Sequence, residues 1–267
     1  MFGENFEKNL LNRFNEENLL EAKSFLSHYL EFKDFSGKTF LDAGCGSGVF
    51  SIVAHQMGAK VTTFDIEEEA LNNLEILKTR FHIEPNQIKS FISDILDVNT
   101  LTSLGQFDLV MCWGVVHHTG NLWQAIDNVS KCVKPDGLIH LGIYNTADNF
   151  GFYPDGRFGT SLFWKKVKRF YSNRATWFQN VIDFFAFLGI FFIYLLSFNN
   201  PIKKLKENER RGMSWQSDLK DWLIGYPYEY ASPEEVFNFM KERGFTLIKL
   251  KTNNGLLTNN YVFKKTN

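Results

Sequence analysis

The stretch that most constrains this chain is residues 39–48, which run Thr-Phe-Leu-Asp-Ala-Gly-Cys-Gly-Ser-Gly. A short strand leads into Asp42, and glycines then stand at every second position, Gly44, Gly46 and Gly48, before a helical pattern begins. Because glycine has no Cβ, such a turn can take positive φ and approach a ligand closely. The spacing D-x-G-x-G-x-G differs from the G-x-G-x-x-G of dinucleotide folds, and no Lys-Ser/Thr pair follows as in a phosphate-binding P-loop. The stretch therefore predicts the strand, turn and helix of a nucleotide pocket in an α/β sheet.

Predicted strands and helices alternate from residue 38 to residue 145, and this rhythm implies a parallel sheet with helices on both faces. Asp65 ends the second predicted strand about 20 residues beyond the glycine turn, where a carboxylate can accept hydrogen bonds from both ribose hydroxyls. NAD enzymes share that feature, so Asp65 alone does not identify the ligand. After residue 231 the rhythm returns with a helix whose start, Ser232-Pro233-Glu234-Glu235, has the form of a capping box. The expected strands are 39–41, 61–66, 88–95, 107–115, 137–144, 245–251 and 259–265.

In these motifs and their order, residues 37–145 resemble the class I S-adenosylmethionine (SAM) methyltransferases. The wider pattern, which includes His117-His118-Thr119-Gly120 and Tyr226-Pro227, is similar to the bacterial type-11/12 group of these enzymes over nearly the whole chain. The resemblance implies a doubly wound, mostly parallel, seven-stranded Rossmann-like sheet with one antiparallel strand. Four parts are expected: N-terminal helices at 1–37, the SAM-binding α/β core at 38–145, a helical insertion or lid at 146–230, and a C-terminal helix and strands at 231–267 that complete the sheet.

The same resemblance implies SAM as cofactor and S-adenosylhomocysteine (SAH) as product. Asp42 would order the turn near the amino-acid end of SAM, Asp94 would bind the adenine amino group, and Ile95 would pack on the adenine ring. The predicted cofactor-binding residues are Asp42, Gly44, Cys45, Gly46, Ser47, Gly48, Asp65, Ile66, Asp94, Ile95 and Trp113.

Two adjacent histidines, His117 and His118, follow the fourth predicted strand, at the edge of the sheet where open α/β folds bind ligands. Because histidine titrates near neutral pH, either can act as a general base, and His117 is the first choice. A structural role in shaping the cofactor pocket is the alternative. Tyr144 ends the fifth predicted strand at the same edge, where it can orient an acceptor or cap the sheet. The histidine pair lacks helical spacing and a carboxylate partner, so no metal site is predicted.

The segment 181–198 is almost continuously apolar, with a length at the lower limit for a membrane span. Asp183 interrupts it, and basic residues on both sides argue against a single crossing. Three interpretations stay open: a lid or homodimer face packed on the catalytic domain, a peripheral membrane contact with Lys and Arg at the headgroups, and a span. A lid or dimer face is the interpretation that we prefer.

Basic residues outnumber acidic ones between Arg157 and Arg211. They can form a solvated helix face, or they can attract an anionic acceptor such as a phosphate, a carboxylate or a nucleotide sugar. Aromatic and acidic residues follow the insertion and can line the acceptor side of the cleft, although packing of a lid explains them equally well. The predicted substrate-binding residues are Arg210, Arg211, Trp215, Tyr226 and Tyr228.

Charge and cysteine usage narrow the function further. The net charge of −1 gives no overall polycation for nucleic acid, and no N/D-P-P-Y/F base-flipping motif is present. The three scattered cysteines indicate reduced thiols, and the first residues show no secretory signal, so we expect a cytoplasmic protein, with the membrane-peripheral alternative kept for 181–198.

The function that these patterns favour is O-methylation, with SAM, of a small or carrier-linked anionic acceptor, for example in surface-glycan (polysaccharide) modification. One alternative is methylation of a lipid or quinone precursor at a membrane. Another is a non-catalytic SAM-binding module. An NAD-type oxidoreductase is disfavoured by the glycine spacing. Methyl transfer requires the acceptor oxygen and the methyl group to be held in line, at roughly 3 Å, and requires a base only when the acceptor is a neutral hydroxyl or amine.

Overall fold

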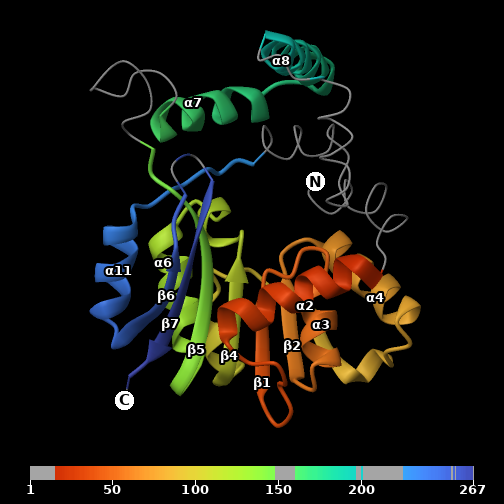
Figure 1. The fold of residues 1–267 in the computed structure, drawn as a ribbon, viewed down its shortest axis with the longest axis vertical. Helices are drawn as coiled ribbons and strands as arrows, with labels where there is room; N and C mark the ends of the chain where they lie inside the picture. Colours follow the sequence, from red (N-terminus) through yellow and green to blue (C-terminus); the bar gives the residue numbers. More distant parts are fainter. Residues whose placement is uncertain are drawn as a thin grey trace.

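The computed structural model describes residues 16–147, 160–196, 200, 225–253, 255 and 257–266. Its centre is one seven-stranded sheet with the strand order β3-β2-β1-β4-β5-β7-β6 (Figure 1). The strands are β1 (Thr39–Ala43), β2 (Lys60–Asp65), β3 (Ile88–Ile92), β4 (Phe107–Trp113), β5 (Val133–Tyr144), β6 (Phe245–Lys251) and β7 (Thr258–Lys265).

Strands β1 to β5 run parallel, and β7 lies antiparallel between β5 and β6. The chain moves outward from β1 to β3 and then returns to β4 on the other side of β1. The strand order therefore reverses between β1 and β4, and open α/β sheets bind ligands at the carboxyl ends of the strands beside such a reversal. The predicted fold class, a mostly parallel seven-stranded sheet, is confirmed.

Two expected strand boundaries were wrong by three residues or more, and the others differ by two residues at most. The third strand ends at Ile92 instead of residue 95, so Asp94 and Ile95 lie in the loop that follows it. The fifth strand begins at Val133 instead of residue 137, because the Pro-Asp-Gly sequence that suggested a turn is carried inside the strand, with Asp136 at φ 62°.

Helices cover both faces of the sheet and bury two apolar clusters. On one face, α2, α3 and α4 pack with Phe40, Val61 and Met111. On the other, α5, α6 and α11 pack with Leu41 and Val110. Alternating strand residues thus point to opposite cores, as expected for a sheet that is buried on both sides. These helices are α2 (Glu16–Leu30), α3 (Val49–Gln56), α4 (Glu68–Arg80), α5 (Val98–Ser103), α6 (Leu122–Lys131) and α11 (Pro233–Lys241), and short 3-10 turns lie at η1 (Pro85–Gln87) and η2 (Val116–His118).

Two further helices, α7 (Ser161–Ser172) and α8 (Thr176–Leu196), fall within the predicted insertion and lie beyond the edge of the sheet at which β5 ends (Figure 1). The chain leaves and rejoins the core at one place. Ala231 forms a bridge with Asn145, and its backbone exchanges hydrogen bonds with Tyr144 O (3.1 Å) and Thr146 N (3.3 Å). Among the described helices, none combines the length and apolarity needed to cross a membrane.

Candidate functional site

The glycine turn after β1 is fixed against the neighbouring strand. The N–H groups of Gly44 and Cys45 both donate to Phe64 O of β2, at 2.9 and 3.1 Å. Gly44 has φ 78°, and a Cβ at this position would lie 2.5 Å from Val115 Cγ2. Gly48 has φ 76°, and a Cβ there would lie 2.6 Å from Leu74 Cδ1. The two glycines are therefore required both by backbone conformation and by space.

Asp65 lies directly across from this turn. Its Oδ2 accepts the N–H of Gly46 at 2.8 Å, and its Oδ1 accepts the N–H of Glu67 at 3.0 Å. Burial raises the pKa of this carboxyl above its usual range, and the two backbone donors oppose that rise. An acid beside an exposed glycine N–H at the end of β2 is where the sequence predicts the ribose contact, which stays a prediction.

Asp42 has a different environment. Its side chain is buried, and its Oδ2 accepts the hydroxyl of Ser51 in α3 at 2.7 Å. Burial raises the pKa of Asp42 to about 7, with the nearby charge of Asp65 acting in the same direction. Asp42 therefore ties the turn to the first turns of α3, which fits the predicted ordering role. Cys45 is buried beside it, and burial raises its thiol pKa, so it is a packed neutral group.

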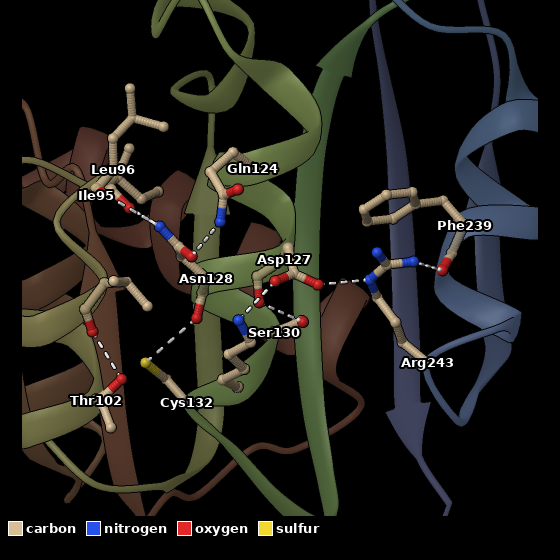
Figure 2. A network of polar contacts seen from close by, with 12 residues as sticks. Ile95, Leu96, Thr102, Gln124, Asp127, Asn128, Ser130, Cys132, Phe239 and Arg243 are labelled. Carbon is tan, nitrogen blue, oxygen red and sulfur yellow. Dashed lines mark hydrogen bonds and ion pairs between the residues drawn. The ribbon is translucent and has the colours of Figure 1, made fainter.

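The loop after β3 carries the predicted adenine contacts and is held from α6. Asn128, buried in α6, donates from Nδ2 to Ile95 O (3.1 Å) and Leu96 O (3.3 Å), as Figure 2 shows. Asp94 closes the loop on itself by accepting the Leu96 N–H at 2.8 Å. The Ile95 side chain belongs to the core, whereas Ile66, after β2, is 63% exposed. Of the two predicted isoleucines, only Ile66 has an exposed side chain, and both cofactor contacts stay predictions.

Trp113, at the end of β4, is held by a hydrogen bond and by contacts of its ring. Its Nε1–H donates to Asn260 Oδ1 of β7 at 2.8 Å, and its ring meets Phe25 of α2 edge-on with centroids 5.8 Å apart. The indole lies against Gly142, where any Cβ would collide with it. Trp113 therefore joins the sheet to α2 at the edge of the predicted pocket, and its cofactor contact stays a prediction.

The two histidines of η2 are held in opposite tautomers by backbone partners. His117 Nδ1 faces the N–H of Tyr144 at 3.3 Å, so this nitrogen accepts and the proton resides on Nε2. His118 Nδ1 faces Pro227 O at 2.8 Å, so this nitrogen donates and the lone pair resides on Nε2. Burial lowers the pKa of His117 far below its usual range and that of His118 to about 4, so both rings are neutral near pH 7.

Aromatic rings surround this pair. The Tyr144 ring lies 3.9 Å from the His117 ring and 5.3 Å from that of Tyr228, between centroids. Tyr228 is buried, and burial raises the pKa of its hydroxyl. Tyr226 is partly exposed, and the backbone of Glu229 donates to His117 O at 2.9 Å. The last residues of the predicted insertion thus pack directly on the histidines. Arg210, Arg211 and Trp215 lie outside the described residues.

Lys168 is the functional candidate that the sequence analysis missed. It comes from α7, is 1% exposed, and holds its ammonium 5.1 Å from the centre of the Tyr228 ring. Burial lowers the pKa of Lys168 to about 8, and its charge helps to lower the pKa of both histidines. The available signal was helical spacing: Ser161, Lys168 and Tyr171 share the buried face of α7, seven and ten positions apart. From the sequence, Lys168 was only one of the basic residues between Arg157 and Arg211, which could form a solvated face or attract an anionic acceptor.

The site therefore has two neighbouring parts. One is a turn shaped by glycines, with Asp65 across from it. The other is a cluster of neutral imidazoles and phenols with one buried amine. Within the described residues, no group of three or more His, Cys, Asp or Glu side chains is arranged to hold a metal ion.

Comparison with known proteins identifies the family of this chain. A family model described as a methyltransferase domain matches residues 11–250. The chain is 32% identical over 114 residues to the ubiquinone biosynthesis O-methyltransferase of Glaesserella parasuis serovar 5 (strain SH0165), a match that covers 41% of this chain and 46% of that protein. It is 30% identical over 110 residues to the corresponding protein of Shewanella halifaxensis (strain HAW-EB4), covering 41% and 44%. These matches span about half the length of the curated relatives.

Solved structures share the fold at low identity. The magnesium protoporphyrin IX methyltransferase of Synechocystis PCC 6803 with bound SAH aligns with a TM-score of 0.54 at 14% identity, over 93% of this chain and 83% of that chain. An O-methyltransferase family protein of Burkholderia thailandensis aligns with a TM-score of 0.53 at 10% identity, over 95% of this chain and 58% of that chain.

Proposed function

The chain belongs to the methyltransferase-domain family, and we propose that it transfers the methyl group of SAM to an oxygen of a small or carrier-linked acceptor bound beside His118 and Lys168. The observation that carries the proposal is the cluster at the carboxyl end of β5, where a buried ammonium lies among neutral rings. The fold neighbour from Synechocystis holds SAH, which supports SAM as the cofactor here.

The residues of this chain fit such a cofactor. The turn has open space beside Gly46, where an added Cβ would meet no atom within 4 Å, and Asp65 accepts the N–H of this same glycine. SAM supplies a methyl group on a sulfonium, which is already a good leaving group. The protein then has to align the acceptor oxygen and exclude water, and this alignment is the larger part of its contribution.

The opposite tautomers divide the proton chemistry between the two histidines. His118 carries its lone pair on Nε2 and can take the proton of a neutral hydroxyl acceptor, whereas His117 carries a proton on Nε2 and can donate to an acceptor oxygen. With SAM bound, the methyl group would come from its sulfonium, and His118 Nε2 would take the proton that a neutral hydroxyl acceptor loses. We therefore assign the base role to His118 instead of His117, with Tyr144 and Tyr228 as walls.

Lys168 selects the acceptor by charge. The positive charge of its ammonium attracts an anionic or readily ionised oxygen. The proposed acceptor therefore carries a phenol, a carboxylate or a phosphate at this point.

A second candidate is a quinone-precursor acceptor. The curated relatives are named for ubiquinone biosynthesis, and a phenolic precursor meets the same requirement at Lys168 and His118. Surface-glycan modification, which the sequence suggested, has no support from the relatives named above.

The test uses calorimetry with SAH and a radiolabelled methyl assay with a phenol, a carboxylate and a phosphate ester. Wild-type protein should bind SAH and methylate at least one acceptor. Lys168→Met should raise the KM for that acceptor and keep SAH affinity, whereas Lys166→Met, an exposed neighbour on α7, should change neither. Absence of SAH binding by the folded protein would refute the proposal. Equal KM values in the wild type and Lys168→Met would refute the role of Lys168.

A further inference from the structure

The outer face of α8 is an exposed apolar stripe. Its large side chains stand out from the body of the protein, with Trp177 69% and Leu196 78% exposed at the two ends of the helix. They recur at intervals of three, four and seven residues, which places them along one side of an α-helix. The stripe consists of Trp177, Val181, Phe184, Phe185, Phe192, Leu195 and Leu196.

The acid of α8 is turned away from this stripe. Asp183 accepts the Tyr171 hydroxyl of α7 at 2.8 Å, so it faces the neighbouring helix. The acid of α8 therefore adds no negative charge to the apolar stripe. Such a surface on a water-soluble body normally meets another apolar phase.

The adjoining helix α7 adds positive charge to the same region. Lys166 and Arg169 are exposed on it beside the exposed apolar residues Leu162 and Phe170. Arg174, in the turn between α7 and α8, stacks its guanidinium over the Phe170 ring at 4.2 Å. From residue 160 to residue 196 the chain has five Lys and Arg residues against the single acid Asp183, although its overall net charge is −1. The positive charge is thus concentrated beside the stripe.

The apolar stripe and the positive charge beside it together indicate which partner would cover this face. A symmetric contact with a second copy would set the basic residues of α7 against themselves, because a twofold interface brings the same patch of both subunits together. An anionic lipid surface matches both properties: its acyl boundary accepts the apolar stripe, and its headgroups attract Lys and Arg. Tryptophan at one end of a helix is also suited to the headgroup level. A helix with an apolar stripe on one side and basic residues beside it is suited to lie in the plane of the interface.

We propose that the outer faces of α7 and α8 dock this protein on an anionic lipid bilayer, with the α8 stripe at the headgroup–acyl boundary. The proposal goes beyond methyl transfer and does not require it. It also gives α7 two roles, because Lys168 on its inner face packs on Tyr228, whereas Lys166 and Arg169 on its outer face approach the headgroups.

The test is sedimentation of the full chain with phosphatidylcholine vesicles that contain about a third phosphatidylglycerol, against pure phosphatidylcholine. We expect binding to the anionic vesicles that weakens with salt, and a blue shift of tryptophan emission that Trp177→Phe reduces. The variant Phe184→Ser/Phe185→Ser/Phe192→Ser should lower vesicle affinity by about tenfold or more, because each exposed phenylalanine contributes apolar transfer energy. Lys166→Gln/Arg169→Gln should lower affinity on anionic vesicles alone.

A matched control removes exposed apolar residues elsewhere, as Leu20→Ser/Ile248→Ser/Leu257→Ser, and should bind vesicles like the wild type. SAH calorimetry on every variant confirms that the core is folded and separates a failure here from a failure of the proposed function. Two outcomes would overturn the proposal: no sedimentation with anionic vesicles at low salt, or equal binding by the phenylalanine variant. A wild-type dimer that the phenylalanine variant loses, without vesicle binding, would assign the stripe to a second copy instead.

Discussion

Replacing Asn128 by leucine should loosen the adenine side of the predicted pocket from a distance. The Asn128 amide is buried under the loop after β3 and donates to two carbonyl oxygens, those of Ile95 and Leu96. Each net hydrogen bond contributes roughly 0.5–1.5 kcal/mol, and a buried carbonyl left without a donor costs more. Because leucine fills nearly the same volume, the cavity contribution is small. We expect Asn128→Leu to lower the free energy of unfolding by about 2–4 kcal/mol.

Urea unfolding measures this loss, and calorimetry with SAH measures its effect on binding. If the loop positions the adenine, freeing its two carbonyls should weaken SAH binding by about tenfold, which corresponds to about 1.4 kcal/mol. Gln124→Leu is the matched control, since it removes the 2.7 Å bond to Asn128 Oδ1 and leaves both carbonyl contacts in place (Figure 2). The control should lose less than about 1 kcal/mol and keep its SAH affinity.

Asn128→Asp sharpens the same test. A carboxylate would face two carbonyl oxygens without a proton to donate, so this variant should be less stable than Asn128→Leu at pH 7 and should recover part of the loss in acid, where the carboxyl is protonated. The reasoning fails if Asn128→Leu unfolds within about 0.5 kcal/mol of the wild type and binds SAH equally well.

Three further predictions concern the turn and the cleft. Gly44→Ala should abolish SAH binding and lower stability by about 2–3 kcal/mol in urea unfolding, because alanine at φ 78° collides with Val115; an unchanged SAH affinity would contradict this. The KM for an anionic acceptor should stay flat below pH 8 and rise above it, as Lys168, whose pKa burial lowers to about 8, loses its proton; Lys168→Arg should remove the rise, and a rise that persists would point to another group. Burial raises the pKa of Asp42 from 3.8 to about 7, so the folded state binds more protons than the unfolded state in that window. Stability should therefore fall as pH increases from about 4 to 7, and Asp42→Asn should flatten this slope in urea unfolding measured across the same range.

The sheet could be predicted from the sequence because its signals are local. The glycine turn and the alternating apolar segments are patterns of residues close together in the sequence, and they predicted the observed fold class. The start of β5 was missed for the same reason: Pro135-Asp136-Gly137 is a strong turn signal, but it forms an irregularity within the strand, between the pairs that Val133 and Leu138 make with β4. Tertiary pairing can override such local preferences.

The cluster of histidines, tyrosines and Lys168 was less predictable, because it joins residues that are far apart in the chain. The positions of His118 and Tyr144 at the edge of the sheet followed from the strand order. The tautomers did not, because they depend on Pro227 O, more than a hundred residues later. The burial of Lys168 depends on which face α7 turns to the core, and charge composition carries no information about that face.

The bridge between Asn145 and Ala231 has a consequence for how this fold can change. Because Thr146 and Ala231 meet side by side, everything between them is an excursion that begins and ends at one point of the sheet. The entropy of closing such an excursion grows only slowly with its length, and the register of the strands does not depend on its content. In the proposed function, the acceptor contacts that come from this excursion, such as Lys168, can therefore change without altering the register of the sheet. Replacement of the residues between these anchors is the natural way to give the same catalytic core a different substrate.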